Sequence, residues 1–144
     1  MTTLPIARRP EEVATRTFDW GTIKWLVTPH LDAGADLTTG EVIVYPGKGH
    51  APHVHPHEQE VIYVISGEGV QTVGEDGEPF PIVEGDAVYI PANTLHSTYN
   101  TIWRPLRLVV VYTPGGAETG LDELPDARIL EPGVAPLWAQ VIEG

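Results

Sequence analysis

The chain has no cysteine among its 144 residues, which excludes disulfide bonds and thiolate metal sites. Basic residues are scarce as well: eight lysines and arginines stand against 20 aspartates and glutamates, and the formal net charge is −12. Binding to nucleic acid or to an anionic membrane usually needs a basic patch, so we expect neither partner. No apolar run approaches the roughly 20 residues of a membrane helix. The N-terminus also lacks the apolar segment of a signal peptide, and a cytoplasmic protein is expected.

Glycine and proline, in contrast, are plentiful, with 15 and 14 residues. They separate short segments that are rich in β-branched and aromatic residues. Short strands at close spacing with such turns between them predict an all-β protein, an antiparallel sandwich or barrel. The expected strands are 23–28, 41–45, 60–65, 70–73, 87–90, 96–99 and 107–112.

The length predicts a single domain with a sizeable core. We divide the chain into an N-terminal arm with strands (1–38), a barrel core (39–113) and a C-terminal tail (114–144). The tail is acidic and rich in proline and glycine, so we expect it to be irregular. Within it, Leu137 and Trp138 form an apolar pair that could dock on a neighbouring surface.

Three histidines and one glutamate have the spacing of a metal site on antiparallel strands. His53 and His55 are two apart, so on a strand their side chains point to one face. The same alternation places Glu60 on a face with apolar residues, where a carboxylate needs a cation or hydrogen-bond donors. His96 follows on a later strand. We therefore predict that His53, His55, Glu60 and His96 bind one metal ion.

Imidazole and carboxylate ligands together suit iron, nickel, manganese, zinc or copper, and the residue types do not choose among these divalent metals. Three imidazoles and one carboxylate leave two positions of an octahedron open. Open positions are a requirement of a catalytic metal rather than of a structural one.

The two segments that carry these residues resemble the paired motifs of the cupin superfamily. The first motif is matched by Gly47, His53, His55, Glu60 and Gly67, and the second by Gly85, Pro91, His96 and Asn100. Asn93 stands where the second motif usually has glycine, and asparagine tolerates left-handed backbone better than most residues. The resemblance implies a cupin barrel, or jelly roll, over residues 40–113, with the same four residues as metal ligands.

The resemblance says less about the reaction, because one fold hosts many functions. It implies a small-molecule substrate, and the small single-domain cupins favour a metal-dependent oxygenase, most simply a dioxygenase. The alternatives are a metal-dependent isomerase, lyase or decarboxylase of a sugar or small acid, and a barrel that binds a ligand without turnover.

Other charged or titratable residues near the motifs have open roles. His50 and His57 are expected at the rim of the site, and His57 could replace His53 if the strand register were shifted. His30 is expected in an exposed turn. Arg104 and Arg107 could hold a substrate carboxylate, although pairing with surface acids is the simpler expectation.

The N-terminal arm is strand-like and partly apolar. Unpaired sheet edges invite pairing, so the arm could cover a second protomer in a two-fold homodimer, an assembly that the cupin resemblance also implies. The rival interpretation is that the arm closes its own barrel in a monomer. The apolar residues concerned are Phe18, Trp20, Ile23, Trp25 and Val27.

Overall fold

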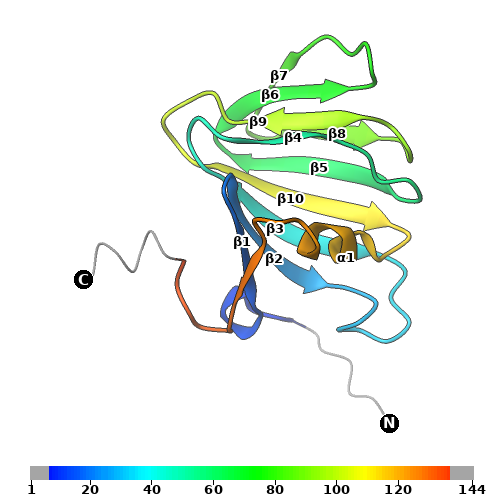
Figure 1. Ribbon diagram of the computed structural model, residues 1–144, viewed down its shortest axis with the longest axis vertical. Helices are drawn as coiled ribbons and strands as arrows, with labels where there is room; N and C mark the ends of the chain where they lie inside the picture. The colour runs from blue at the N-terminus through cyan, green and yellow to red at the C-terminus, as the bar shows by residue number, and fades with distance from the viewer. Residues whose placement is uncertain (1–6, 137–144) are drawn as a thin grey trace.

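The computed structural model describes residues 7–136, and almost all of its regular structure is β-strand (Figure 1). This confirms the all-β class. The elements are η1 (Pro10–Glu12), β1 (Thr15–Phe18), β2 (Gly21–Val27), β3 (Thr38–Val44), β4 (Gly49–His53), β5 (Gln59–Ser66), β6 (Glu68–Val73), β7 (Phe80–Val83), β8 (Ala87–Ile90), β9 (His96–Tyr99), β10 (Leu106–Thr113), α1 (Ala117–Asp122) and β11 (Arg128–Leu130).

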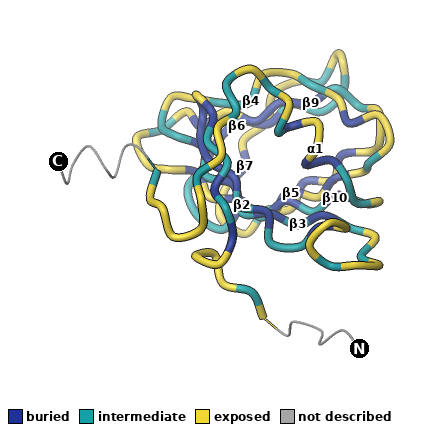
Figure 2. Tube along the Cα trace, turned by 60° about the horizontal axis from the view of Figure 1, so that its bottom comes forward, coloured by how far each residue is buried: buried dark blue, intermediate teal, exposed yellow. Residues whose placement is uncertain are grey.

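The strands form two antiparallel sheets that enclose a common interior (Figures 1 and 2). The larger sheet has the order β11-β1-β2-β3-β10-β5-β8, and the smaller one has the order β4-β9-β6-β7. Neighbours in both sheets are far apart in the sequence, as in β3 beside β10 and β6 beside β9. This is the expected jelly-roll arrangement.

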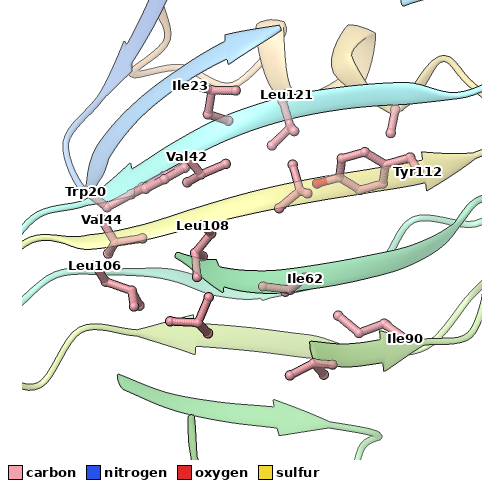
Figure 3. Packing of buried hydrophobic residues seen from close by; sticks show 14 of the residues in the cluster. Trp20, Ile23, Val42, Val44, Ile62, Ile90, Leu106, Leu108, Tyr112 and Leu121 are labelled. Atoms are coloured by element: carbon pink, nitrogen blue, oxygen red, sulfur yellow. The ribbon is translucent and has the colours of Figure 1, made fainter. Parts of the chain in front are cut away.

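Alternating burial along the strands separates the interior from the surface. In β5, Glu60, Ile62 and Val64 are buried, whereas Val61 and Tyr63 between them are exposed. The period of two follows from the pleat of a strand with one face on the core. The interior is apolar over most of its length (Figure 3). Its larger members include Phe18, Trp20, Trp25, Val44, Ile62, Ile82, Ile90, Leu106, Leu108, Tyr112 and Leu121.

The N-terminal arm belongs to the barrel of its own chain. β2 pairs with β3, and β1 pairs with β2, so the two strands widen the larger sheet. Phe18, Trp20, Ile23 and Trp25 are all buried in the core of the same chain. This placement agrees with the interpretation in which the arm closes its own barrel. The homodimer stays a prediction.

The C-terminal tail was expected to be irregular, but it contains α1 and β11. β11 pairs with β1 at the outer edge of the larger sheet. α1 is held by its buried Leu121 and by Glu118, whose Oε2 accepts a 2.7 Å hydrogen bond from the hydroxyl of Thr38. Within residues 7–136, no helix is long and apolar enough to cross a membrane. Leu137 and Trp138 lie outside the described residues.

Candidate metal centre

Three strands supply three of the predicted ligands, and the bend between β4 and β5 supplies the fourth, so His53 and His55 do not share a strand as the spacing predicted. His53 ends β4 and lies opposite His96, the first residue of β9, in the antiparallel register of the smaller sheet. Glu60 enters from β5 in the larger sheet. His55 lies in the bend between β4 and β5, where the amide of Asn93 donates a 2.9 Å hydrogen bond to its carbonyl oxygen. Asn93 has the left-handed φ of 57° that the motif position requires.

The side chains converge on a small volume. One ring nitrogen from each of His53, His55 and His96 lies within 4.8 Å of the other two. Glu60 Oε1 is 3.1 Å from His96 Nε2 and 3.7 Å from His55 Nε2. Glu60 and His96 are 3% and 2% exposed. The four predicted residues are therefore neighbours in the fold.

Backbone carbonyls set the orientation of two of the imidazoles. His53 Nδ1 lies 2.7 Å from the carbonyl oxygen of Ala51, and His96 Nδ1 lies 2.8 Å from that of Thr94. A carbonyl can only accept, so each Nδ1 carries the proton and each Nε2 keeps a free lone pair. This is the usual support of a metal-binding histidine.

Three atoms of the cluster are buried without a hydrogen-bond partner among the described residues: His55 Nε2, Glu60 Oε1 and His96 Nε2. Glu60 Oε1 and His96 Nε2 are 3.1 Å apart, but while the His96 proton is on Nδ1 both atoms are acceptors, so they form no hydrogen bond with each other. Buried polar atoms are almost always satisfied, and unpaired ones point to an ion or a ligand. One cation between them would satisfy all three, so the donor set fits a divalent transition metal.

The electrostatics of the cluster keep most of its imidazoles neutral. Burial lowers the pKa of His53 to about 2 and that of His50 to about 4, and neighbouring histidines add to both shifts. Burial also lowers the pKa of His55. His96 differs: burial lowers its pKa, but the Glu60 carboxylate would accept a hydrogen bond from the protonated ring and attracts its charge, and together these effects outweigh burial and raise the pKa.

Aromatic rings support the cluster from two sides. His50 stacks on His53 with ring centroids 3.7 Å apart, and Trp20 stacks on His50 at 5.0 Å. Tyr112 and His55 form a T-shaped pair with ring centroids 5.0 Å apart, and burial, together with the charge of Glu60, raises the Tyr112 pKa. His50 is therefore a packing partner of His53.

The remaining candidates lie away from the cluster. His57 is exposed and outside the group of converging histidines, so a shifted register is not adopted. His30 is exposed in a turn, as expected. Arg107 pairs with Glu41 at 2.7 Å on the surface, which agrees with the expectation of a surface acid, rather than a substrate carboxylate, as its partner. Arg104 is exposed and lines neither of the cavities at the centre.

Two cavities meet at the cluster. An outer cleft of about 260 Å³ lies between α1 and the β4–β5 bend, and an inner cavity of about 40 Å³ lies within the barrel. His55 lines the outer cleft, whereas Glu60 and His96 line the inner cavity. No pattern in the sequence predicts the α1 wall, because a helix of six residues is too short for a periodic pattern. α1 and its flanking turns line the cleft with Gly116, Ala117, Thr119, Gly120, Leu121 and Leu124.

Comparison with known proteins agrees with this geometry. A family model for the cupin domain matches residues 40–112. The protein MJ1618 of Methanocaldococcus jannaschii is 32% identical over 98 residues, which cover 68% of this chain and 77% of that protein. A Klebsiella pneumoniae protein with a double-stranded β-helix domain superposes with a TM-score of 0.60 at 27% identity, covering 70% of this chain and 83% of that one.

Several of the similar proteins carry the names of enzymes, which differ in their reactions. Glucose-6-phosphate isomerase of Thermococcus kodakarensis is 33% identical over 99 residues, which cover 60% of this chain and 50% of the isomerase. Quercetin 2,3-dioxygenase of Bacillus subtilis is 32% identical over 83 residues, which cover 54% of this chain and 24% of the dioxygenase. The chain thus spans half or less of either enzyme. The match of the family model over half of the chain, together with the double-sheet barrel, shows that this protein belongs to the cupin family.

Proposed function

We propose that the protein is a metal-dependent enzyme in which His53, His55, Glu60 and His96 hold one divalent transition metal. The observation that carries the proposal is the convergence of three buried, unpartnered atoms from His55, Glu60 and His96. When bound, such a metal supplies Lewis acidity and, if it is iron, nickel, manganese or copper, redox chemistry.

The surroundings favour catalysis over a structural metal. A structural site is closed, with every ligand position filled by protein. Here the four residues lie between a cleft and an inner cavity, so a small molecule can approach them. His53 and His96 are held by backbone carbonyls, and apolar side chains make up most of the inner cavity wall. The histidines are therefore held in fixed orientations beside a space that a small molecule can enter.

Among reactions, we favour a dioxygenase that acts on a small organic molecule. Such a reaction places both atoms of dioxygen in the product and needs no added reductant. Among the described residues, no lysine or arginine lines either cavity, and Glu58 adds a negative charge to the cleft. A phosphorylated substrate would find no cation there. The likeness to quercetin 2,3-dioxygenase therefore supports the proposal better than the likeness to glucose-6-phosphate isomerase does.

The alternatives are a metal-dependent isomerase, lyase or decarboxylase of an unphosphorylated sugar or a small acid, and a barrel that binds without turnover. Oxygen uptake separates them. Protein loaded with iron, nickel or manganese is incubated with a flavonol or a diketone in an oxygen electrode cell. Uptake that matches product formation supports the dioxygenase. Conversion without uptake supports the alternative enzymes, and binding without conversion supports the non-catalytic barrel.

The ligand assignment has a simpler test. Protein purified without chelators or added metal is expected to hold about one divalent ion per chain by elemental analysis. His96→Ala is expected to lose most of this metal, because it removes a buried donor from the cluster. His57→Ala is the matched control, since His57 is an exposed histidine outside the cluster. Equal retention of metal in both variants would show that the assignment is wrong.

A further inference from the structure

The two cavities at the metal centre share three lining residues: His50, His53 and Leu121. These three side chains form the partition between the outer cleft and the inner cavity. His53 is one of the proposed ligands, and His50 is stacked on it at 3.7 Å. Leu121 is therefore the member of the partition that is free of the metal cluster.

Leu121 comes from α1, outside the barrel strands, and its side chain packs down into the core. Figure 3 shows it among the buried residues; it is 5% exposed and lines the inner cavity together with Val42 and Tyr112. The helix that carries it is fixed to β3 by the hydrogen bond between Thr38 and Glu118. Leu121 is thus held in place by its helix, which is tied to the barrel.

The sizes of the two spaces differ strongly. A cavity needs about 10–15 Å³ to hold one water molecule, so the inner cavity of about 40 Å³ has room for roughly three. A diatomic molecule, a carboxyl group or a chelating pair of oxygens fits such a space, and an aromatic ring does not. The outer cleft, at about 260 Å³, is large enough for a ring, and Val54, Pro56 and Leu124 give it apolar walls.

We propose that Leu121 determines substrate specificity by limiting the end of the substrate that reaches the metal centre. The substrate class is then a molecule with a compact oxygen-bearing end, which passes Leu121, and an apolar body, which stays in the outer cleft. This inference rests on the proposed metal site. It goes further by naming the residue that selects the substrate and the shape that is selected, and of the two substrates offered above it favours the diketone, whose chelating oxygens need not be carried on a ring.

Three hydroxamic acids test the inference, because they share one chelating end and differ in the body. Acetohydroxamic acid has a methyl group, benzohydroxamic acid has a ring attached directly to the chelating carbon, and 4-phenylbutanohydroxamic acid has the ring on a flexible chain. Binding to the cobalt(II)-loaded protein is followed by the visible absorption of the metal. The wild-type protein is expected to bind the first and third compounds and to bind benzohydroxamic acid about tenfold or more weakly.

Leu121→Ala is expected to strengthen binding of benzohydroxamic acid by about tenfold or more relative to acetohydroxamic acid, because the ring can then enter the partition. Leu124→Ala is the matched control: it removes the same atoms from the outer cleft alone. It should leave that ratio unchanged and weaken the phenylbutano compound. If Leu121→Ala does not unfold cooperatively, the milder Leu121→Val is used instead, and the ratio of the two affinities should change less but in the same direction.

The possible failures are distinct. A wild-type chain that takes up no cobalt overturns the proposed metal site, and this inference with it. A cobalt-loaded chain that binds acetohydroxamic and benzohydroxamic acids equally well overturns the role of Leu121 alone. The same holds if Leu121→Ala and Leu124→Ala change the ratio of the two affinities alike.

Discussion

At the scale of single residues, the cluster combines neutral imidazoles with one histidine that attracts a proton. Burial lowers the pKa values of His53 and His55, so protons compete little for these two nitrogens. For His96, the effect of Glu60 exceeds that of burial, and the pKa lies above its ordinary value of 6.5. Without metal, a proton on His96 is stabilised by the Glu60 carboxylate, 3.1 Å away.

This arrangement predicts how metal binding depends on pH. The metal must displace the proton from His96, so affinity should fall as pH drops through the raised pKa of His96 and below it. Replacing the carboxylate by an amide in Glu60→Gln removes the charge that raises this pKa, and burial then lowers it. The midpoint of the pH dependence should move to lower pH, although the affinity itself falls. Cobalt(II) titrations between about pH 5 and 8 measure both effects; an equal midpoint in both proteins would contradict the prediction.

At the scale of elements, α1 depends on one buried hydroxyl. Thr38 is fully buried on β3; its hydroxyl donates to Glu118 and accepts a 3.0 Å hydrogen bond from the Gly116 amide. Both contacts lie in the segment that carries Leu121. Because α1 has only six residues, its own hydrogen bonds cannot hold it in place, and tertiary contacts must do so.

We therefore expect Thr38→Val to loosen the cleft wall. The substitution keeps the shape of the side chain but leaves the Gly116 amide and one Glu118 oxygen without their partner. The free energy of unfolding should fall by about 1–3 kcal/mol, as measured by urea denaturation. Thr39→Val is the control, since Thr39 is only partly buried on the same strand. A loss of stability as large in Thr39→Val would show that the β-strand, rather than the bond to α1, is affected.

The elements also show what the sequence could and could not predict. Short segments rich in β-branched and aromatic residues predict β5, β8 and β9 closely, and in β5 and β8 the residues alternate between the core and the surface. β4 was missed: its sequence is GHAPH, it has no apolar alternation, and no residue in it is fully buried. β11 has three residues and exists through its pairing with β1. α1 is likewise defined by contacts with distant residues, which no local pattern reveals.

The ligands of the candidate site, unlike these elements, are visible in the sequence. Spacing in the sequence predicts its four polar side chains, and all four lie together. Spacing is sufficient because two short segments carry the whole cluster, and they pair with each other within both sheets, β4 with β9 and β5 with β8. Leu121, in contrast, lies 25 residues beyond His96 on a different element. Its position at the cleft depends on how the tail folds back, so the partition could be found only in three dimensions.

At the scale of the whole molecule, oligomeric state remains the open prediction. The larger sheet ends in β11 on one side and β8 on the other, and the smaller one ends in β4 and β7. Exposed sheet edges invite pairing with another chain, and two-fold dimers are the commonest closed assembly. We expect the full-length chain to be a homodimer, with a molar mass by light scattering close to twice 15.7 kDa. A mass of one chain across the accessible concentration range would contradict this.

The N-terminal arm could complete the barrel of its own chain or hold two protomers together, and truncation of the arm distinguishes these two roles. A chain that starts at Thr39 lacks β1 and β2, which removes Trp20 and Trp25 from the core and leaves β3 without its partner on one side. Burying a large side chain contributes a few kcal/mol, and removing one costs about 3–5 kcal/mol, so two such losses are comparable to the whole stability of a small domain. We therefore expect the truncated chain to aggregate or to lose cooperative thermal unfolding. If the truncated chain instead unfolds cooperatively as a dimer, the arm is dispensable for both the core and the assembly. If the truncated chain unfolds cooperatively as a monomer while the full-length chain is a dimer, the arm acts between protomers rather than within one.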